Sequence, residues 1–305
     1  MINFVIMFVC LLAGAFIRRC AKLSIRDVRP LNTIIIWFSL PAVIVTQIPL
    51  LIRSGGVTSD LSIAVATPWF NFFCSIAFVV ALGRMFGWSR GVIGALGLTA
   101  GLGNTSFVGL PVVEALFGEP GTRIAILLDQ MGSFLILATL GLLVASICAG
   151  RELTVATVGK RVLTFPPFVA FVAAVAWGVS GAPVEGFFVE ALKRIGTTLL
   201  PLALLSVGWQ LELNLKTLKQ YALPLSCGLV FKLLLWPLIV VAFTGHSTLA
   251  TQVNAIEAAM PTMITSAVVA ADFELESELA QLMVGLGIPL SAFTLWMWAT
   301  LLKFI

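Results

Sequence analysis

The chain has 305 residues, of which 60% are hydrophobic and only 10% charged, with a formal net charge of +4 and a mean hydropathy of +1.09. Ordinary soluble domains are about 25% charged, so this composition excludes a soluble globular protein. Apolar runs long enough to cross a hydrocarbon core about 30 Å thick recur along the whole length. The sequence therefore predicts an all-α polytopic membrane protein.

Ten transmembrane helices are predicted in chain order. The first apolar segment, INFVIMFVCLLAGAFIRR, lacks the basic start and the cleavage site of a signal peptide, so we expect it to remain as a span. Breaks at charged or Gly/Pro-rich loops separate the others. The predicted ranges are 2–18, 31–50, 62–82, 92–117, 121–147, 162–180, 187–209, 221–243, 248–271 and 279–303. All connecting loops are short, so no soluble domain is expected between the spans.

The basic residues predict the orientation of these spans. The loop after the first span, RRCAKLSIRDVRP, is the most basic stretch, and we expect it to face the cytoplasm. If the spans alternate, most other lysines and arginines fall on the same side. Both termini then face the periplasmic side of a bacterial inner membrane. The acidic loop ADFELESEL also falls on the cytoplasmic side, although acidic residues weigh little in this rule.

Chemistry-bearing residues of other classes are scarce. The five cysteines are scattered, without CxxC spacing, so we expect neither disulfides nor a metal site, and no cofactor. The single histidine, His246, lies at the start of a predicted span. Neither HExxH nor GxSxG is present, which argues against an enzyme. No nucleic-acid partner is expected.

Two pairs of spans predict an internal repeat. The second and seventh spans each carry a Leu-Pro pair, at Pro41 and Pro201. Placing Asn104 over Pro261 aligns the fourth span with the ninth at nearly the same offset. Residues 1–150 and 151–305 are therefore predicted to be two five-helix units, and because five is odd, the second unit is inverted in the membrane. Chance is the alternative explanation, since Leu-Pro pairs are common in apolar sequence.

The fourth and ninth spans are predicted to be broken and to cross. LTAGLGNTSFVGLPVV (98–113) contains Gly103, Gly109 and Pro111 around three adjacent polar residues, and AIEAAMPTMITS (255–266) contains Pro261. Glycine and proline weaken a helix, and backbone groups freed at membrane depth must find partners, so such breaks are tolerated where they line a cavity. Close helix packing through small residues is the alternative reading.

Polar residues at these breaks are the candidate substrate-binding groups. They are Asn104, Thr105, Ser106, Thr262, Thr265 and Gln130, with Gln47 as a weaker candidate. Gly103, Gly109, Pro111 and Pro261 are predicted to hold the breaks open.

Charged residues within spans are candidates for ion coupling, because each is costly at the centre of a membrane helix. Asp129 and Glu257 are predicted to bind H+ or Na+; the alternative is that either acid lies at a misplaced helix end. Lys232 has three possible roles: snorkelling, pairing with an acid, or neutralising a substrate carboxylate. Glu114 lies near the GEPG turn and is expected to reach water.

Three motifs resemble the auxin efflux carrier family. GNTSFVGLPVVEALFG resembles the fourth-span signature of that family, LNTIIIWFSLPAVIV its second span, and AAMPT its ninth. The resemblance covers essentially the whole chain. It implies two inverted five-helix repeats, a transport domain that moves against a scaffold domain, a homodimer, and export or exchange of organic anions such as auxin or malonate. The long central loop of plant members is missing, so regulation through such a loop is not expected.

The sequence as a whole predicts a secondary active transporter of small organic anions that works by an elevator-type motion. The main alternative is a sodium- or proton-coupled cation antiporter, or a bile-acid-type symporter, with the same architecture. A channel and a sensor without transport also remain open. Acids near the site complicate anion binding, unless a proton or Na+ enters with the substrate.

Overall fold

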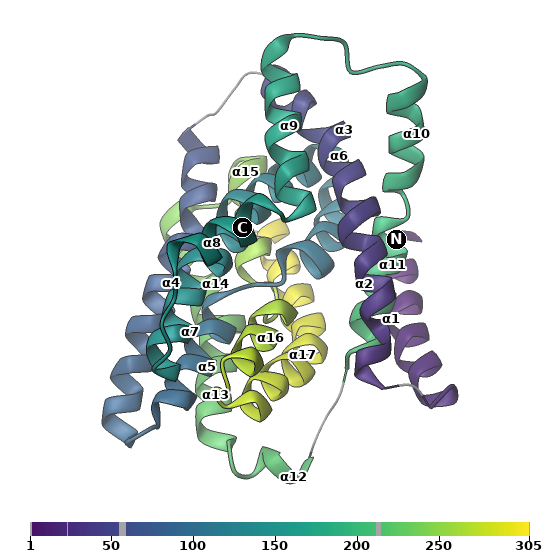
Figure 1. The fold of residues 1–305 in the computed structure, drawn as a ribbon. Helices are drawn as coiled ribbons and strands as arrows, with labels where there is room; N and C mark the ends of the chain where they lie inside the picture. Colours follow the sequence, from purple (N-terminus) through teal and green to yellow (C-terminus); the bar gives the residue numbers. More distant parts are fainter. Residues whose placement is uncertain (1, 23, 55–58, 212–214, 305) are drawn as a thin grey trace.

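The protein is helical throughout the part of the chain that the structure describes. The structure is a computed structural model and describes residues 2–22, 24–54, 59–211 and 215–304. Over these ranges it contains helices joined by short connections and no β-strand, in agreement with the predicted all-α class. Figure 1 shows the helices running roughly along one common direction.

Five helices are long and apolar enough to cross a membrane, judged over the described residues. They are Arg29–Arg53, Ser59–Phe86, Thr105–Ala149, Ala222–Thr244 and Ser277–Leu302. A sixth is added if Val155–Leu163 and Pro166–Ser180, which meet at a bend of 66°, are counted as one span. Each of the ten predicted spans has a helical counterpart, but several counterparts are short or broken. The count of ten spans and the inverted repeat therefore stay predictions.

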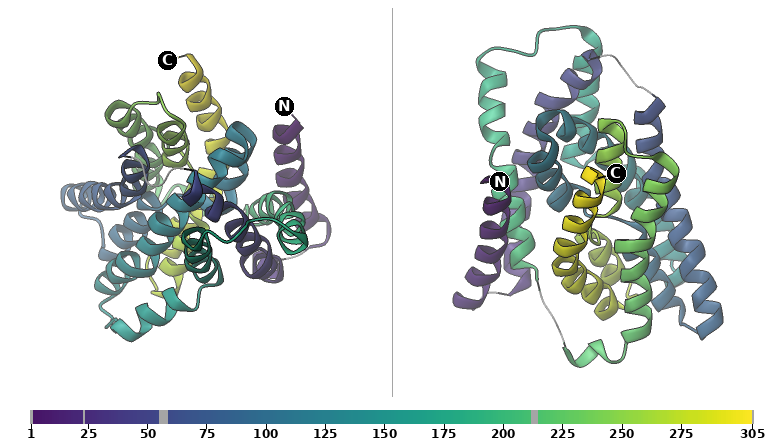
Figure 2. Two further views of the ribbon diagram at one scale, coloured as in Figure 1. Left: turned by 90° about the horizontal axis from the view of Figure 1, so that it is seen from above. Right: turned by 180° about the vertical axis from the view of Figure 1, so that it is seen from behind.

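One group of helices forms a flank of the molecule. Seen from above, the purple N-terminal helix lies at this flank and the blue α4 lies on the opposite side (Figure 2). Within the flank, α1 packs along α11, and α3 packs along α9 and α10. Its elements are α1 (Ile2–Cys20), η1 (Ile25–Val28), α2 (Arg29–Ile34), η2 (Ile35–Ser39), α3 (Leu40–Arg53), α9 (Pro166–Ser180), α10 (Phe187–Gly196) and α11 (Leu199–Trp209). The short helix α8 (Val155–Leu163) contacts both α9 and the second helix group described below.

Glycines allow the flanking helices to approach closely. A Cβ atom at Gly14 of α1 would overlap the backbone of α11 at Leu205, and one at Gly208 of α11 would overlap the backbone of α1 at Leu11. The packing of small residues expected in membrane proteins is thus present here.

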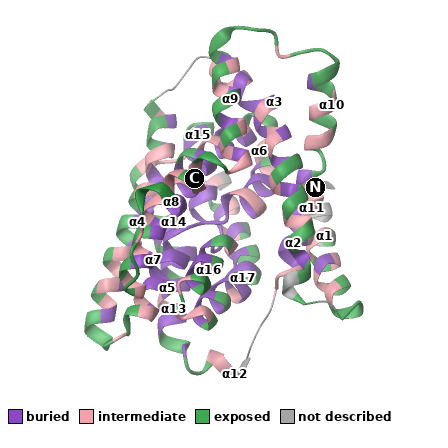
Figure 3. Ribbon diagram, viewed as in Figure 1, coloured by how far each residue is buried: buried purple, intermediate pink, exposed green. Residues whose placement is uncertain are grey.

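The remaining helices form a second group, the core. Figure 3 shows buried residues gathered in its interior, where α5 and α15 are buried along most of their length. Its elements are α4 (Ser59–Phe86), α5 (Arg90–Gly101), η3 (Thr105–Gly109), α6 (Leu110–Leu128), η4 (Asp129–Phe134), η5 (Leu137–Gly141), α7 (Leu142–Ala149), α12 (Leu215–Leu218), α13 (Ala222–Val230), η6 (Phe231–Leu235), α14 (Trp236–Thr244), α15 (Leu249–Ala258), α16 (Ile264–Asp272) and α17 (Ser277–Phe304).

Three prolines follow wide π-helical turns. Pro41, Pro111 and Pro237 each occupy the second position of an α-helix that continues from η2, η3 or η6. In each case the residue before the proline donates its N–H five residues back, as Leu110 does to the carbonyl of Thr105. A proline has no N–H to donate and clashes with a normal helical turn, so a wider turn keeps the helix continuous.

A kink separates the predicted fourth and fifth spans. Gly118 has φ +66° and ψ −162°, a conformation that favours glycine, and α6 changes direction there. The change of direction thus occurs at the GEPG sequence (118–121), between the ranges predicted for the fourth and fifth spans. Glu114, one turn earlier, is exposed.

Candidate functional site

Two helix breaks meet in the middle of the core. The first gap lies between the end of α5 at Gly101 and the start of η3 at Thr105, and the second between the end of α15 at Ala258 and the start of α16 at Ile264.

The two gaps satisfy each other's backbone groups. Gly103 and Thr262 form an antiparallel bridge. The N–H of Asn104 donates to the carbonyl of Pro261 at 2.7 Å, and the N–H of Met263 donates to the carbonyl of Leu102 at 3.0 Å. Backbone groups freed by the breaks are therefore paired across the crossing, as an apolar environment requires.

Asp129 is held on one side of this crossing by three donors. The hydroxyls of Thr105 and Ser106 each donate to its Oδ1 at 2.5 Å, and Nε2 of Gln130 donates to its Oδ2 at 2.7 Å. The carboxyl group is 1% exposed. Short bonds to both oxygens stabilise an ionised carboxylate and fix the hydroxyls of the first turn of η3.

The side-chain amide of Asn104 has one atom that is hydrogen-bonded and one that is not. Its Oδ1 accepts a hydrogen bond from the N–H of Phe107 at 3.1 Å, which caps the N-terminus of η3. Its Nδ2 is buried and has no partner among the described residues. Because an unpaired buried donor is costly, this amide is positioned for a ligand or water.

A cavity of about 190 Å³, called the main cavity below because it borders the helix crossing, opens beside Asn104 and Asp129, while a larger, apolar cavity of about 670 Å³ lies between α1, α6, α11 and α17. The polar lining residues of the main cavity include Arg161 of α8, and its apolar ones include Phe134 and Phe165, whose rings stack at 4.2 Å. The lining residues are Asn32, Ile36, Leu40, Asn104, Ser106, Phe107, Asp129, Phe134, Leu137, Ala138, Arg161, Phe165, Gln210, Met263, Ile264 and Thr265. A mostly apolar cavity with a few convergent polar groups is typical of a small-molecule site.

A second cavity of only about 20 Å³, called the polar chamber below, lies against the crossing and is also bordered by α4 and η6. Lys232 of η6 is 1% exposed, and its Nζ donates to the carbonyl of Ala258 at 3.3 Å. Glu257 is 3% exposed, and neither of its oxygens accepts a hydrogen bond from another described residue. The chamber is lined by Thr67, Pro68, Asn71, Gly101, Gly103, Thr105, Leu128, Ser133, Lys232, Trp236, Asn254, Glu257 and Ala258.

Comparison with known proteins decides the class. Residues 1–299 match the family described as Membrane transport protein, which is the auxin efflux carrier family. The chain belongs to this family. It is 28% identical over 300 residues to an uncharacterized transporter of Methanothermobacter thermautotrophicus, covering 96% of this chain and 95% of the relative. It is 24% identical over 306 residues to an uncharacterized transporter of Methanocaldococcus jannaschii, covering 97% of each chain.

The transporter brings four of its predicted polar site residues to the main cavity. Asn104, Ser106, Thr265 and Asp129 all line it. Thr105 instead lines the polar chamber while bonding to Asp129.

Two further candidates, Gln130 and Thr262, lie at the crossing but do not line the main cavity. Gln130 is fully buried and holds Asp129. Thr262 lies in the crossing itself, and its hydroxyl has no partner among the described residues.

The four residues predicted to hold the breaks open divide into two pairs. Gly103 and Pro261 lie within the two gaps. Gly109 and Pro111 lie in helical turns after the first gap, because the wide turn of η3 accommodates the proline without interrupting the chain's helical path. The break in the fourth predicted span is therefore confined to residues 102–104.

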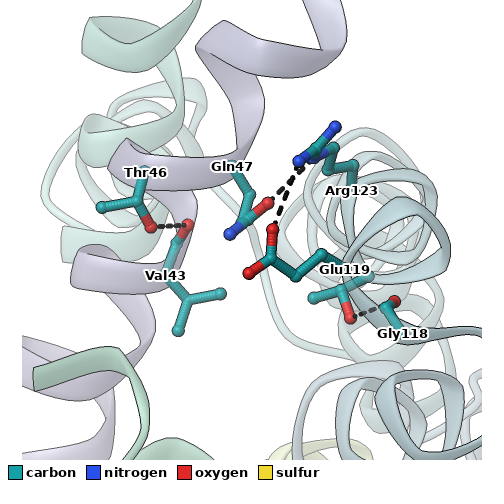
Figure 4. A network of polar contacts seen from close by, with 7 residues as sticks. Val43, Thr46, Gln47, Gly118, Glu119 and Arg123 are labelled. Carbon is teal, nitrogen blue, oxygen red and sulfur yellow. Dashed lines mark hydrogen bonds and ion pairs between the residues drawn. The ribbon is translucent and has the colours of Figure 1, made fainter. Parts of the chain in front are cut away.

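Gln47 lies away from both cavities. Its Oε1 accepts a hydrogen bond from Nε of Arg123 at 2.9 Å, and Nη2 of Arg123 pairs with Glu119 at 3.3 Å (Figure 4). This contact joins α3 of the flank to the part of α6 that follows Gly118. Gln47 is thus a contact between the two helix groups and does not line the main cavity.

Sequence reasoning missed several lining residues of the transporter. Arg161 was counted among the loop charges, and Asn32 and Gln210 lie near the ends of predicted spans. Asn71 and Asn254 lie inside predicted spans, and an uncharged amide in a long apolar run is the signal that would have singled them out.

Proposed function

We propose that this transporter carries small organic anions, such as malonate- or auxin-like carboxylates, through the main cavity. The observation that carries the proposal is the buried, unpaired Nδ2 donor of Asn104, a residue that lines the main cavity together with Arg161. An amide donor and a guanidinium suit a carboxylate, and the guanidinium can offset repulsion from Asp129. Ser106 and Thr265 add hydroxyls on the same cavity wall.

The size and lining of the cavity support a small substrate with an apolar part. A volume of about 190 Å³ fits a compact molecule. Phe107, Phe134 and Phe165 add apolar side chains to the lining that also contains the polar groups. A carboxylate on an aliphatic or aromatic body matches both kinds of lining residue.

An elevator-type motion of the core against the flank is the transport mechanism we propose. In the predicted repeat, the first span corresponds to the sixth and the second to the seventh. α1 and α11 lie in the first and seventh spans, and α9 and α3 lie in the sixth and second. Exchanging each span for its counterpart turns the α1–α11 contact into the α9–α3 contact, so the two contacts fit the predicted repeat. The crossed gaps belong to the core and the main cavity lies between core and flank, so movement of the core would carry the site.

The membrane setting follows from the same proposal. We place the protein in a bacterial inner membrane as a homodimer, with both termini on the periplasmic side. The expected coupling ion is H+ or Na+, with Asp129 and Glu257 as the candidate groups.

A cation antiporter or bile-acid-type symporter is the second candidate function. The observation that favours it is the buried carboxylate of Glu257, whose oxygens have no partner in the described chain. Such a protein would respond to Na+ or to pH without any organic anion.

Counterflow into proteoliposomes tests the proposal. Vesicles containing purified transporter are loaded with unlabelled malonate or indole-3-acetate, and uptake of the labelled compound is followed. Accumulation that is lost in Asn104→Asp supports the anion carrier, because this variant keeps the capping oxygen and removes the free donor. Exchange of Na+ or protons alone, with no anion accumulating, would favour the second candidate.

A further inference from the structure

Four oxygen atoms around the polar chamber lack a donor. They are Oδ1 of Asn71, Oδ1 of Asn254, and both carboxyl oxygens of Glu257, and none has a hydrogen-bond partner among the described residues. The three side chains are 4%, 1% and 3% exposed, so bulk water does not satisfy them. A buried set of unpaired acceptors indicates a missing donor or cation.

Neighbouring bonds fix which amide atom of each asparagine is free. Nδ2 of Asn71 donates to the carbonyl of Gly101 at 3.0 Å, so its oxygen must be the unpaired atom. Nδ2 of Asn254 donates at 3.0 Å to Oγ1 of Thr67, whose own hydrogen is donated to the carbonyl of Ile63. A flipped amide would place oxygen against oxygen in the first case and leave Thr67 without a donor in the second.

The charges around the chamber do not balance. Glu257 is acted on by two charged groups, Lys232 from η6 and Asp129 from η4. The side chains that α4 contributes to the lining, Thr67 and Asn71, are uncharged. With all three groups ionised, two carboxylates face one ammonium at the chamber, and one negative charge is left over there, because Arg161 lines the main cavity and not the chamber. An uncompensated charge in a medium of low polarity is strongly unfavourable.

We propose that the polar chamber binds one monovalent cation, Na+ or a proton, and that its binding favours anion binding in the main cavity. The chamber's volume of about 20 Å³ holds one water-sized species, so Na+ enters without its hydration shell and is ligated by the free oxygens. A proton would settle on the carboxyl group of Glu257. Either source supplies the single positive charge that the core lacks.

Thr105 and Asp129 connect the two sites. Thr105 lines the polar chamber, and its hydroxyl donates to Asp129, which lines the main cavity. A cation in the chamber lowers the negative potential at Asp129 and so reduces repulsion of a carboxylate. By linkage, the anion strengthens cation binding by the same factor. This coupling rests on the proposed function, whereas cation binding in the chamber does not.

The experiment uses the full chain in lipid nanodiscs. Thermal unfolding is followed by tryptophan fluorescence in NaCl and in choline chloride, each at an acidic and an alkaline pH, without any anion substrate. Calorimetry then measures malonate binding in the same four conditions. Na+ or acidic pH is expected to tighten malonate binding by about 5- to 150-fold, the usual range of coupling between sites.

Three variants identify the chamber as the source of the effect. Glu257→Gln is expected to abolish the cation effect, and the nearly isosteric amide replaces oxygens that have no partner to lose. Lys232→Met is expected to strengthen the effect, because it removes the competing positive charge. Glu114→Gln, which neutralises an exposed acid of α6, is the matched control and should leave the effect unchanged.

The four conditions separate the two sources and the two proposals. A Na+ effect at alkaline pH identifies Na+, and a pH effect in choline identifies the proton. Malonate binding that is independent of both, or a cation effect that survives Glu257→Gln, overturns the chamber proposal and leaves the anion carrier standing. Cation-dependent stability that is lost in Glu257→Gln, with no anion binding, supports the chamber and removes the proposed anion function.

Discussion

The two buried carboxylates at the helix crossing differ in their partners rather than in their burial. Asp129 accepts three short hydrogen bonds and borders the main cavity, whereas Glu257 accepts none from the described residues and borders the polar chamber. Both are nearly inaccessible to solvent. From this comparison we propose that Asp129 mainly organises the substrate site, and that Glu257 is the more available of the two coupling candidates for a cation.

Removing the free donor of the main cavity should have the largest effect. Asn104→Asp is expected to reduce carboxylate binding by more than about tenfold, since a hydrogen bond to a charged group contributes about 1.5–3 kcal/mol and a negative charge is added. The capping oxygen remains, but the added charge is buried and should lower the melting temperature, so binding is measured at a temperature at which the variant stays folded. Malonate calorimetry on this variant beside the wild type is the measurement, and undiminished affinity would remove Asn104 from the site.

Exchanging each carboxylate for its amide compares the two regions directly. Asp129→Asn should destabilise the protein by about 1–3 kcal/mol, because at least one of its three donors loses an acceptor. Glu257→Gln should cost less, because its oxygens accept no hydrogen bond from the described residues, although Lys232 loses a nearby charge. Equal losses in both variants, measured by thermal unfolding, would show that the two carboxylates are supported alike.

Neutralising the cation of the main cavity should weaken anion binding less than the loss of Asn104. Arg161→Gln is expected to lower malonate affinity by about tenfold, equivalent to about 1.4 kcal/mol. Lys160→Gln is the matched control, since Lys160 lies next to Arg161 on α8 but is exposed and does not line the cavity. An equal effect of the two variants would indicate general electrostatics and not a contact with the substrate.

Filling the space beside Glu257 should weaken the cation effect attributed to this carboxylate. A Cβ at Gly109 would lie 2.5 Å from Oε2 and 2.7 Å from Oε1 of Glu257, so Gly109→Ala must move the carboxyl group. That group is the flexible end of its side chain and can move. The loss in free energy of unfolding should therefore be near the lower limit of about 1–3 kcal/mol that overpacking usually costs. The cation effect on melting temperature should fall. Gly159→Ala, where a Cβ meets nothing within 4 Å, is the control.

The smallest effect is expected far from both sites. Glu119→Gln removes the surface pair with Arg123 seen in Figure 4, in which Glu119 is 66% exposed. Exposed ion pairs contribute about 0–1 kcal/mol, and Arg123 keeps its bond to Gln47. Malonate affinity should not change. A loss of affinity comparable to that of Arg161→Gln would show that the contact between α3 and α6 controls the site.

The positions of the helix breaks could largely be predicted from local sequence. Proline, glycine and three adjacent polar residues in an apolar run are costly in a helix, which is why Asn104 and Pro261 could be placed at breaks from sequence alone. Pro111 lies after the break, at the second position of α6, because a π-helical turn relieves the clash that the rule assumes.

Residues brought together by packing could not be predicted in this way. Arg161 borders the cavity only because α8 bends by 66° from α9, and no local pattern encodes that position. The polar chamber joins Asn71, Lys232 and Asn254, which are far apart in the chain. Gln47 is a polar residue in an apolar span, as a cavity-lining residue would be. Its side-chain oxygen instead accepts a hydrogen bond from Arg123 of another helix.

The central claim is that this transporter binds and moves a carboxylate at the crossing of its two broken helices. The most direct test is the current produced by proteoliposomes on a solid-supported membrane when malonate, indole-3-acetate and related mono- and dicarboxylates are applied. The panel is run with and without Na+, at two pH values, for the wild type and for Asn104→Asp. Our account predicts currents for at least one anion that depend on Na+ or pH and vanish in Asn104→Asp. Currents driven by Na+ or pH steps alone, unchanged by any anion and by this variant, would contradict it.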